Sequence, residues 1–339
     1  MRWCSWSVTE RRTELGKGVV GVLLGGLSPE REVSLASGEA VAQALAEVGW
    51  SVRRYDHGLG SESDASVAER LLEALTDGPF ADVEVVFNAL HGGAGEDGRI
   101  QALFELAGIP YTGTGPLGSA LSMDKWLTKL LARSAGVGVP DGVVWERRDP
   151  TSVTTLAAAW GTRLGWPLVV KPVDQGSTVG FSLVEEAEDL ATALEAAAVF
   201  GTRVLVENFV PGREVTVAVV DNTALPVVEI VPSHGVYDYD CKYTPGLSSY
   251  HCPADLETGT VRELQTAALT MFEQLLNRDY SRMDFRLDPQ GRPFLLEANT
   301  LPGFTSTSLV PKAAAAAGIS FPGLCDRLVT AAMARGTDR

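Results

Sequence analysis

Two carboxylates and an amide lie in two neighbouring apolar stretches near the carboxyl-terminal end of the chain. The run FLLEAN ends with Glu297 and Asn299, and the preceding run RMDFRLD contains Asp284. Side chains alternate along a strand, so Glu297 and Asn299 should point to the same side. Oxygen donors without Cys or His suit Mg²⁺. These residues predict a magnesium site. The alternative, a solvated polar face, explains Glu297 poorly because it continues an apolar run.

The pairing of the two runs decides whether their oxygens meet. The turn DPQGRP between them contains the Pro and Gly that suit a tight reversal. If Leu287 pairs with Phe294 across this turn, Asp284 lies opposite Glu297. Directly opposed residues have Cβ atoms ~5 Å apart. We therefore expect the two carboxylates to converge.

A glycine loop follows a lysine in the stretch VVKPVDQGSTVGFSLV. Lys171 ends an apolar strand, and residues 174–180 form a loop that leads into the next strand. Glycine lets backbone N–H groups approach an anion closely, and Ser177 and Thr178 add hydroxyls. The spacing is not GxxxxGK[ST], and strand follows strand, so neither a P-loop nor a dinucleotide fingerprint is present. The loop is a candidate phosphate contact, with an ordinary Gly-Ser hairpin turn as the alternative.

Three further residues have both a functional and a purely structural interpretation. In VENFVPGRE, Glu207 ends one apolar strand and Glu214 begins the next. Such carboxylates could accept hydrogen bonds from an adenine amine or from ribose hydroxyls, whereas the alternative is a surface hairpin. His91 follows an apolar strand and precedes two glycines, where it could simply satisfy a turn carbonyl.

The elements that must position these residues follow two patterns. The first half alternates strand and helix, which predicts a parallel sheet with helices on its faces. The expected strands there are 18–24, 52–56 and 83–90, and the expected helices are 34–48, 65–76 and 99–107. A helix capped by Ser122 should follow, with Leu127, Leu130 and Leu131 on its apolar face. The remaining half is rich in β-strands, and its long aromatic stretch over 232–253 suits a lid.

Composition narrows the class of protein. The 339 residues favour two or three domains, and a net charge of −15 argues against a nucleic-acid or anionic-membrane partner. The four cysteines have no zinc spacing, which favours reduced thiols in the cytoplasm. The first 18 residues lack the apolar core of a signal peptide, and no apolar run is long enough to span a membrane.

The motifs taken together resemble one family. In order, the chain contains VLLGGLSPEREVSLASG, ALHGGAGEDGRIQ, GIPYTGTG, SALSMDK, VVKPVDQGSTVG, VENFVPGREVTVAVV, YDYDCKY, RMDFRLD and FLLEANTLPGFTSTSLVP. Over residues 18–311 it resembles the D-alanine–D-alanine ligase family of the ATP-grasp superfamily. The resemblance implies an α/β (α+β) fold with a Rossmann-like N-terminal domain followed by a two-part ATP-grasp fold. The implied divisions are an extension over 1–17 and domains over 18–114, 115–206 and 207–339.

The resemblance also assigns roles to residues. The implied ATP contacts are Lys125, Lys171, Ser177, Thr178, Glu207, Glu214 and Lys242. Two Mg²⁺ ions, which Mn²⁺ could replace, would be held by Asp284, Glu297 and Asn299. Glu30 would bind the ammonium of the first D-alanine, and His91 would lie close to that substrate. Arg282 and the N–H of Gly303 would form the oxyanion site, and Ser308 would hold the second substrate's carboxylate. Tyr243 of the lid would link Ser177 to Glu30.

The activity implied is ATP-dependent joining of two D-alanines through an acyl phosphate, for peptidoglycan precursor synthesis by a cytoplasmic homodimer. The presence of Tyr243 favours an amine nucleophile over D-lactate. Two departures from the common pattern are Thr178, where a second Ser is usual, and Gly93, where Arg is frequent. Another amino-acid or dipeptide ligase of secondary metabolism is the alternative. A non-catalytic ATP-binding regulator is disfavoured because Arg282, Asp284 and Glu297 are all present.

Overall fold

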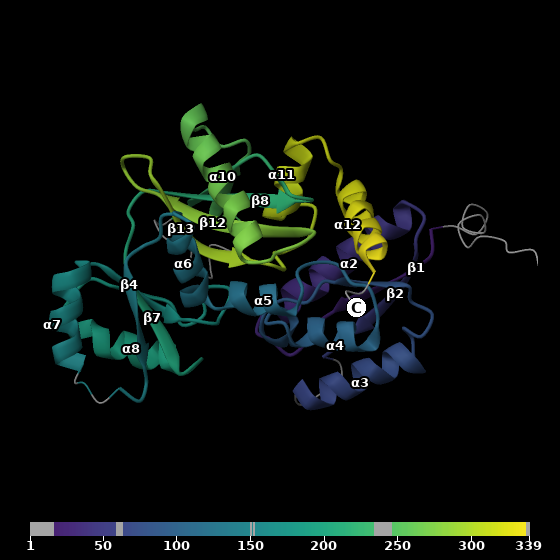
Figure 1. Ribbon diagram of the computed structural model, residues 1–339, viewed down its shortest axis with the longest axis horizontal. Helices are drawn as coiled ribbons and strands as arrows, with labels where there is room; N and C mark the ends of the chain where they lie inside the picture. Colours follow the sequence, from purple (N-terminus) through teal and green to yellow (C-terminus); the bar gives the residue numbers. More distant parts are fainter. Residues whose placement is uncertain (1–16, 59–63, 150, 152, 234–245, 337–339) are drawn as a thin grey trace, which may run out of the picture. The chain divides into compact units, whose positions relative to one another are not determined.

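The structure consists of two compact units. The computed structural model describes residues 17–58, 64–149, 151, 153–233 and 246–336. Unit 1 comprises the described residues of Met1–Pro116 and Leu301–Arg339, and unit 2 comprises those of Leu117–Thr300 (Figure 1). Lys242, Tyr243, most of the predicted lid and residues 1–16 lie outside the described residues. The four-part division expected from the sequence stays a prediction.

Unit 1 is built on a three-stranded parallel sheet in the order β2-β1-β3. Its strands are β1 (Val19–Leu24), β2 (Ser51–Asp56) and β3 (Val85–Asn88). Its helices are α2 (Arg31–Glu47), α3 (Asp64–Thr76), α4 (Arg99–Ala107), α11 (Leu309–Ala316) and α12 (Phe321–Arg335). The central strand β1 is almost entirely apolar because it is buried between its neighbours and the helices. The predicted parallel sheet is confirmed, although the strand expected over 83–90 is shorter.

The last part of the chain belongs to unit 1. Helix α12 packs against α2 and β3. The indole N–H of Trp50 donates a hydrogen bond of 2.8 Å to Asp326 on α12. The ring of Phe304 lies 5.5 Å from that of Phe87 on β3. These contacts place the loop before α11 beside the carboxyl end of β3.

Unit 2 contains two antiparallel sheets. The smaller has the order β4-β7-β5-β6, and the larger has the order β11-β10-β8-β12-β13, with β9 paired to β8. The strands of the smaller sheet are β4 (Gly142–Glu146), β5 (Leu168–Pro172), β6 (Ser182–Val184) and β7 (Arg203–Asn208). Those of the larger sheet are β8 (Arg213–Val220), β9 (Thr223–Ala224), β10 (Val228–Pro232), β11 (Ser248–His251), β12 (Tyr280–Leu287) and β13 (Pro293–Asn299). The helices of unit 2 are α5 (Pro116–Met123), α6 (Lys125–Ser134), α7 (Val153–Leu164), α8 (Leu190–Ala198) and α10 (Thr258–Gln274).

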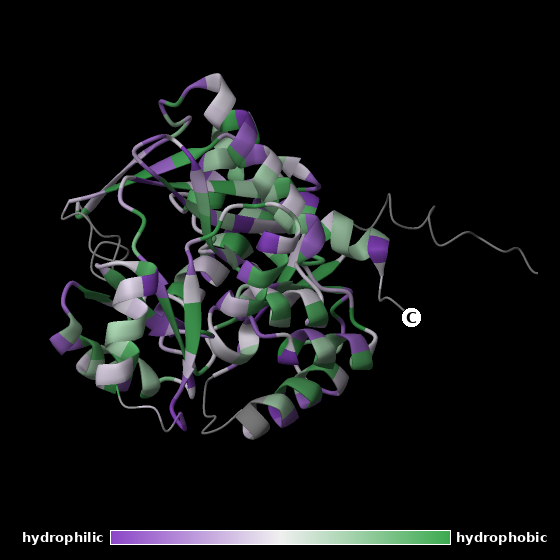
Figure 2. Ribbon diagram, turned by 60° about the vertical axis from the view of Figure 1, so that its left-hand side comes forward, coloured by the Kyte–Doolittle hydropathy of each residue, from purple (hydrophilic) through white to green (hydrophobic). Residues whose placement is uncertain are grey.

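Each sheet of unit 2 has its own hydrophobic core. Helices α7 and α8 bury apolar residues against the smaller sheet, and α10 does so against the larger one. The helices carry both hydrophobic and hydrophilic residues, as expected for helices that cover a sheet with one face (Figure 2). Within the described part of the chain, no helix is both long and apolar enough to cross a membrane.

Helix α6 corrects the prediction made for its start and its buried face. The N-cap is Asp124, whose side chain accepts a hydrogen bond of 2.9 Å from the N–H of Leu127, and not Ser122. Leu127 and Leu130 are 38% and 42% exposed. Among its buried residues are Lys125 and Lys129, and Leu131 is partly buried against the core of the larger sheet. The two lysines point inward because each forms an ion pair with a carboxylate of the sheets, as described below.

The hairpin β12-β13 contains a bulge that the alternation did not predict. Leu287 pairs with Pro293, so the predicted partner Phe294 is wrong by one residue. A register shift between Asp284 and Phe285 inserts Leu296 into β13, and beyond it Asp284 lies opposite Glu297 as predicted. Bulges commonly re-aim side chains next to functional sites.

Candidate active site

A pocket lies within unit 2, lined by residues of both sheets. Its walls include apolar side chains, such as those of Val169, Phe209 and Leu296, with charged groups among them. Of the predicted ATP contacts, those that line it are Lys125, Lys171, Thr178, Glu207 and Glu214. The predicted metal ligand Glu297 also lines it.

Glu207 is buried between two lysines. It is 1% exposed, which contradicts the surface-hairpin alternative. Its Oε1 lies 2.8 Å from the Nζ of Lys171 on β5, and its Oε2 lies 3.0 Å from the Nζ of Lys129 on α6. Burial opposes ionisation of Glu207, but the two ammonium groups outweigh it and hold its pKa below the ordinary value. Glu207 therefore stays ionised inside the protein.

The two lysines respond differently to this environment. Burial lowers the pKa of Lys129 to about 8, although Glu207 partly offsets the effect. For Lys171 burial acts in the same direction, but the carboxylates of Glu207 and Glu297 outweigh it and raise its pKa. Lys129 also donates a hydrogen bond of 3.2 Å to the carbonyl of Leu295, the residue before the bulge. Lys129 thus ties α6 to both sheets.

Lys125 connects the predicted metal ligands to the glycine loop. Its Nζ lies 3.4 Å from Oε2 of Glu297 and also donates to the carbonyl of Gln175. In that loop Ser177 and Thr178 have φ of 48° and 62°, which is the left-handed region that side chains seldom adopt. The loop is therefore an irregular turn with a lysine at its base, as a phosphate contact would require.

Asp284 and Glu297 are brought together by strand pairing. Asp284 accepts hydrogen bonds of 2.6 Å from Thr216 and of 2.8 and 2.7 Å from the guanidinium of Arg282. Arg282 itself lies opposite Asn299 in the hairpin. Two carboxylates and an amide, all oxygen donors, fit Mg²⁺ in type. Among the described residues, no group of three or more His, Cys, Asp or Glu side chains is arranged so that it could hold a metal ion.

Glu214 is held by an arginine that the sequence did not single out. The Nη1 of Arg286 lies 3.2 Å from Oε2 of Glu214, and its Nη2 donates 2.8 Å to the carbonyl of Gly212. The guanidinium also lies over the ring of Phe209, 4.8 Å from the ring centre. Burial lowers the pKa of Arg286. Arg286 therefore fixes Glu214 at the wall of the pocket.

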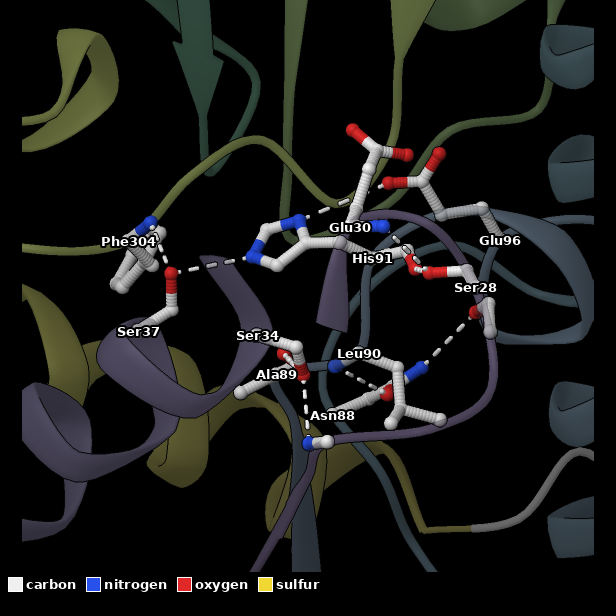
Figure 3. A network of polar contacts seen from close by, with 12 residues as sticks. Ser28, Glu30, Ser34, Ser37, Asn88, Ala89, Leu90, His91, Glu96 and Phe304 are labelled. Atoms are coloured by element: carbon white, nitrogen blue, oxygen red, sulfur yellow. Dashed lines mark hydrogen bonds and ion pairs between the residues drawn. The ribbon is translucent and has the colours of Figure 1, made fainter. Parts of the chain in front are cut away.

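A second cluster lies in unit 1 around His91 (Figure 3). His91 is buried, and its Nδ1 lies 3.8 Å from Oε1 of Glu96. Its Nε2 lies 3.1 Å from Oγ of Ser37. The ring thus faces a carboxyl and a hydroxyl, and the alternative in which it satisfies a turn carbonyl is wrong. Burial raises the pKa of Glu96, and the charge of Glu30 adds to this effect.

Glu30 immediately precedes α2 and lies beside the glycine that follows His91. A Cβ added to Gly92 would lie 2.5 Å from Oε2 of Glu30, and φ at Gly92 is +68°. Glycine is therefore favoured at position 92 by the backbone conformation, and its missing side chain leaves room for the carboxylate of Glu30. Gly303 and Ser308 also lie together, since a Cβ on Gly303 would be 3.3 Å from Oγ of Ser308.

The predicted site residues therefore fall into two sets. Those in unit 2 are Lys125, Lys171, Ser177, Thr178, Glu207, Glu214, Arg282, Asp284, Glu297 and Asn299. Those in unit 1 are Glu30, His91, Gly303 and Ser308. Sequence reasoning missed Ser37, Lys129 and Arg286. For Lys129 a signal existed, because it follows Lys125 by four residues and so shares its helix face.

Comparison with protein families gives a consistent result. Residues 51–114 match the family described as D-ala D-ala ligase N-terminus, and residues 131–330 match D-ala D-ala ligase C-terminus. A D-alanine–D-alanine ligase of Pelotomaculum thermopropionicum is 44% identical over 319 residues, which cover 93% of this chain and 96% of that protein.

Solved structures agree. The crystal structure of D-alanine–D-alanine ligase from Bacillus anthracis complexed with ATP aligns with a TM-score of 0.79 and 28% identity, and the alignment covers 94% of this chain and 98% of that one. The VanG D-Ala:D-Ser ligase from Enterococcus faecalis aligns with a TM-score of 0.77 and 32% identity, covering 93% and 99% of the two chains.

Proposed function

The chain belongs to the D-alanine–D-alanine ligase family, and from this premise we propose that it joins two D-alanine molecules at the expense of ATP. Its fold is that family's ATP-grasp fold, as the sequence predicted. The product would serve peptidoglycan precursor synthesis. The observation that carries the proposal is the pocket of unit 2, where Lys125 and Lys171 meet the carboxylates of Glu297 and Glu207.

The nucleotide would occupy this pocket. Its apolar walls suit an adenine ring, with Glu207 as acceptor for the adenine amine and Glu214 for the ribose. Lys125, Lys171 and the loop residues Ser177 and Thr178 would contact the phosphates, and Lys242 would add a further contact. Lys125 and Lys171 are each paired with a carboxylate, so their ammonium groups are already positioned and need little rearrangement.

Asp284, Glu297 and Asn299 would hold Mg²⁺, which when bound would neutralise phosphate charge. Mn²⁺ has the same preference for oxygen donors and could substitute for it. Arg282 is bound to Asp284 through two hydrogen bonds. This contact supports a role in which the arginine is oriented by one of the metal ligands.

The chemistry would proceed in two steps. The carboxylate of the first D-alanine attacks the γ-phosphorus of ATP, which releases ADP and leaves an acyl phosphate. The amine of the second D-alanine then attacks the acyl carbon, loses a proton, and expels phosphate. Glu30 and His91 would bind the first substrate, and Ser308 the carboxylate of the second. Arg282 and the N–H of Gly303 would stabilise the oxyanion, where one such donor is typically worth ~3 kcal/mol.

The proposal also covers the lid residue, the location of the enzyme and its partners. The lid residue Tyr243 would link Ser177 to Glu30 and favour an amine nucleophile. We place the enzyme in the cytoplasm as a homodimer, in line with the family resemblance. Its net charge of −15 supports neither a nucleic acid nor an anionic membrane as partner.

A coupled assay of phosphate release tests the proposal. We expect release that requires ATP and Mg²⁺ with D-alanine and none with L-alanine. D-serine, D-lactate and a panel of other amino acids should be run in parallel, because a D-Ala:D-Ser ligase is among the structural relatives. Equal turnover of L-alanine would overturn the substrate assignment and favour the alternative dipeptide ligase, while leaving the ligase assignment intact.

A further inference from the structure

The hydroxyl of Ser37 joins two segments that the proposed reaction uses. Ser37 lies on α2 and is fully buried. Its Oγ accepts a hydrogen bond of 3.0 Å from the backbone N–H of Phe304 and lies 3.1 Å from Nε2 of His91. Phe304 directly follows Gly303, the proposed oxyanion donor. Figure 3 shows the Oγ between the imidazole ring and the backbone nitrogen.

The directions of these hydrogen bonds follow from the chemistry of the groups. A backbone N–H can only donate, so Phe304 occupies one lone pair of Oγ. The hydroxyl hydrogen then remains for Nε2 of His91, provided that Nε2 is the unprotonated nitrogen of the ring. A neutral imidazole carries one N–H, and the partner of one nitrogen fixes the state of the other.

The opposite edge of the ring decides between the two tautomers. Nδ1 of His91 lies 3.8 Å from a carboxyl oxygen of Glu96. An N–H on Nδ1 faces this oxygen favourably whether Glu96 is neutral or ionised, because a carboxyl oxygen carries negative partial charge in both states. A lone pair on Nδ1 would be repelled by the same oxygen, and 3.8 Å is too long for a protonated Glu96 to compensate with a hydrogen bond. The hydrogen therefore belongs on Nδ1.

We propose that Ser37 is a positioning residue which holds His91 as the Nδ1–H tautomer and, through the same oxygen, fixes the Gly303–Phe304 peptide. One hydroxyl thereby sets the orientation of a residue beside the first substrate and of the peptide next to the oxyanion donor. The functional part of this inference rests on the proposed ligase activity, whereas the tautomer does not.

Ser34 provides a matched control on the same helix. It is also fully buried, and it lies nearly one turn before Ser37. Its Oγ accepts from the N–H of Gly25 at 2.9 Å and donates to the carbonyl of Ala89 at 2.7 Å. Both partners are backbone groups. Loss of this hydroxyl should cost stability without changing the ring of His91.

Nitrogen NMR of the histidine rings tests the tautomer without any substrate. The chain has four histidines, so the signals of His91 can be assigned from their loss in His91→Gln. In the wild type we expect a protonated Nδ1 and an unprotonated Nε2. Ser37→Ala should move both shifts toward the average of a tautomer mixture, whereas Ser34→Ala should leave them in place. A wild-type spectrum with the proton of His91 on Nε2 overturns the proposal, whatever the result for Ser37→Ala.

Kinetics test the functional part. Ser37→Ala should lower kcat/KM for D-alanine by ~10-fold, the effect of one hydrogen bond, and Ser37→Thr should restore part of it because it keeps the hydroxyl. Equal losses in Ser37→Ala and Ser34→Ala would show that Ser37 acts only through stability. An Nδ1–H tautomer in a protein without ligase activity would refute the proposed function and leave the positioning role standing.

Discussion

The charge of Glu297 matters more to the proposed reaction than its shape. It faces Asp284 across the hairpin and contacts Lys125 at 3.4 Å. Glu297→Gln keeps the volume but removes a metal ligand charge, so we expect turnover to fall at least ~100-fold. The melting temperature should hardly change. Phosphate release and thermal unfolding measure the two effects.

A carboxylate of the same sheet serves as control for Glu297. Glu229 on β10 is paired with Arg213 at 2.6 Å and does not line the pocket. Glu229→Gln should therefore retain most of the activity, because the ion pair of a partly exposed arginine is worth little. Full activity in Glu297→Gln would refute the metal assignment.

The buried ammonium of Lys129 should leave a signature in the pH dependence of stability. Its pKa is lowered from 10.5 to about 8 by burial. Between these values the unfolded chain holds the proton and the folded chain has lost it, so stability rises with pH through this window. The contribution reaches about 3 kcal/mol at ~1.36 kcal/mol per pKa unit.

Lys129→Met isolates this contribution. The variant lacks the titrating group, so the unfolding free energy of the wild type minus that of the variant should increase from pH 7.5 to pH 10. Urea unfolding at both pH values provides the measurement. A difference that stays constant or decreases would mean that burial does not destabilise the charged form of Lys129.

At the scale of elements, the bulge in β13 explains why two consecutive residues, Leu296 and Glu297, both line the pocket. Leu295 and Ala298 on either side of them belong to the core of the larger sheet. Deleting Leu296 would make the strand regular, with Glu297 still opposite Asp284. We expect the KM for ATP to rise ~10-fold or more, because complete burial of a leucine side chain against a ligand contributes about 1.5–3 kcal/mol.

Leu296→Ala separates the side chain from the bulge. If the bulge itself shapes the pocket, the deletion should raise the KM for ATP more than the alanine variant does. Equal values would limit the role of Leu296 to apolar contact. Thermal unfolding of both variants should remain cooperative, since the core residues keep their alternation.

The same hairpin shows what the sequence could and could not predict. The alternation of side chains correctly placed Glu297 opposite Asp284. The predicted pairing of Leu287 with Phe294 was wrong, because the alternation alone does not reveal where an extra residue is inserted into a strand. The prediction for helix α6 was wrong for another reason. Its leucines are partly exposed because its lysines meet Glu207 and Glu297, and such contacts depend on strands far along the chain. The parallel sheet of unit 1 rests on local patterns and was predicted well.

Distant contacts also explain the site residues that were missed. Ser37 is one of many serines, and only the fold brings its hydroxyl to His91 and to Phe304. Arg286 is 7% exposed and bound to Glu214 on another strand, a contact that only the folded chain shows. Residue type and spacing identified groups that end strands, whereas the groups that orient them became visible only in the folded chain.

At the scale of the whole molecule, the two units should respond to different ligands. The pocket assigned to the nucleotide is lined entirely by residues of unit 2. A non-hydrolysable ATP analogue with Mg²⁺ at 100 times its Kd should stabilise the folded state by about 2.7 kcal/mol, which corresponds to ~100-fold slower amide exchange. We expect this slowing first in β5, β7, β12 and β13, measured by hydrogen–deuterium exchange.

D-alanine alone should instead slow exchange near Glu30, His91 and Ser308 in unit 1. Nucleotide protection confined to unit 1 would contradict the assignment of the pocket, because none of its lining residues belongs to that unit.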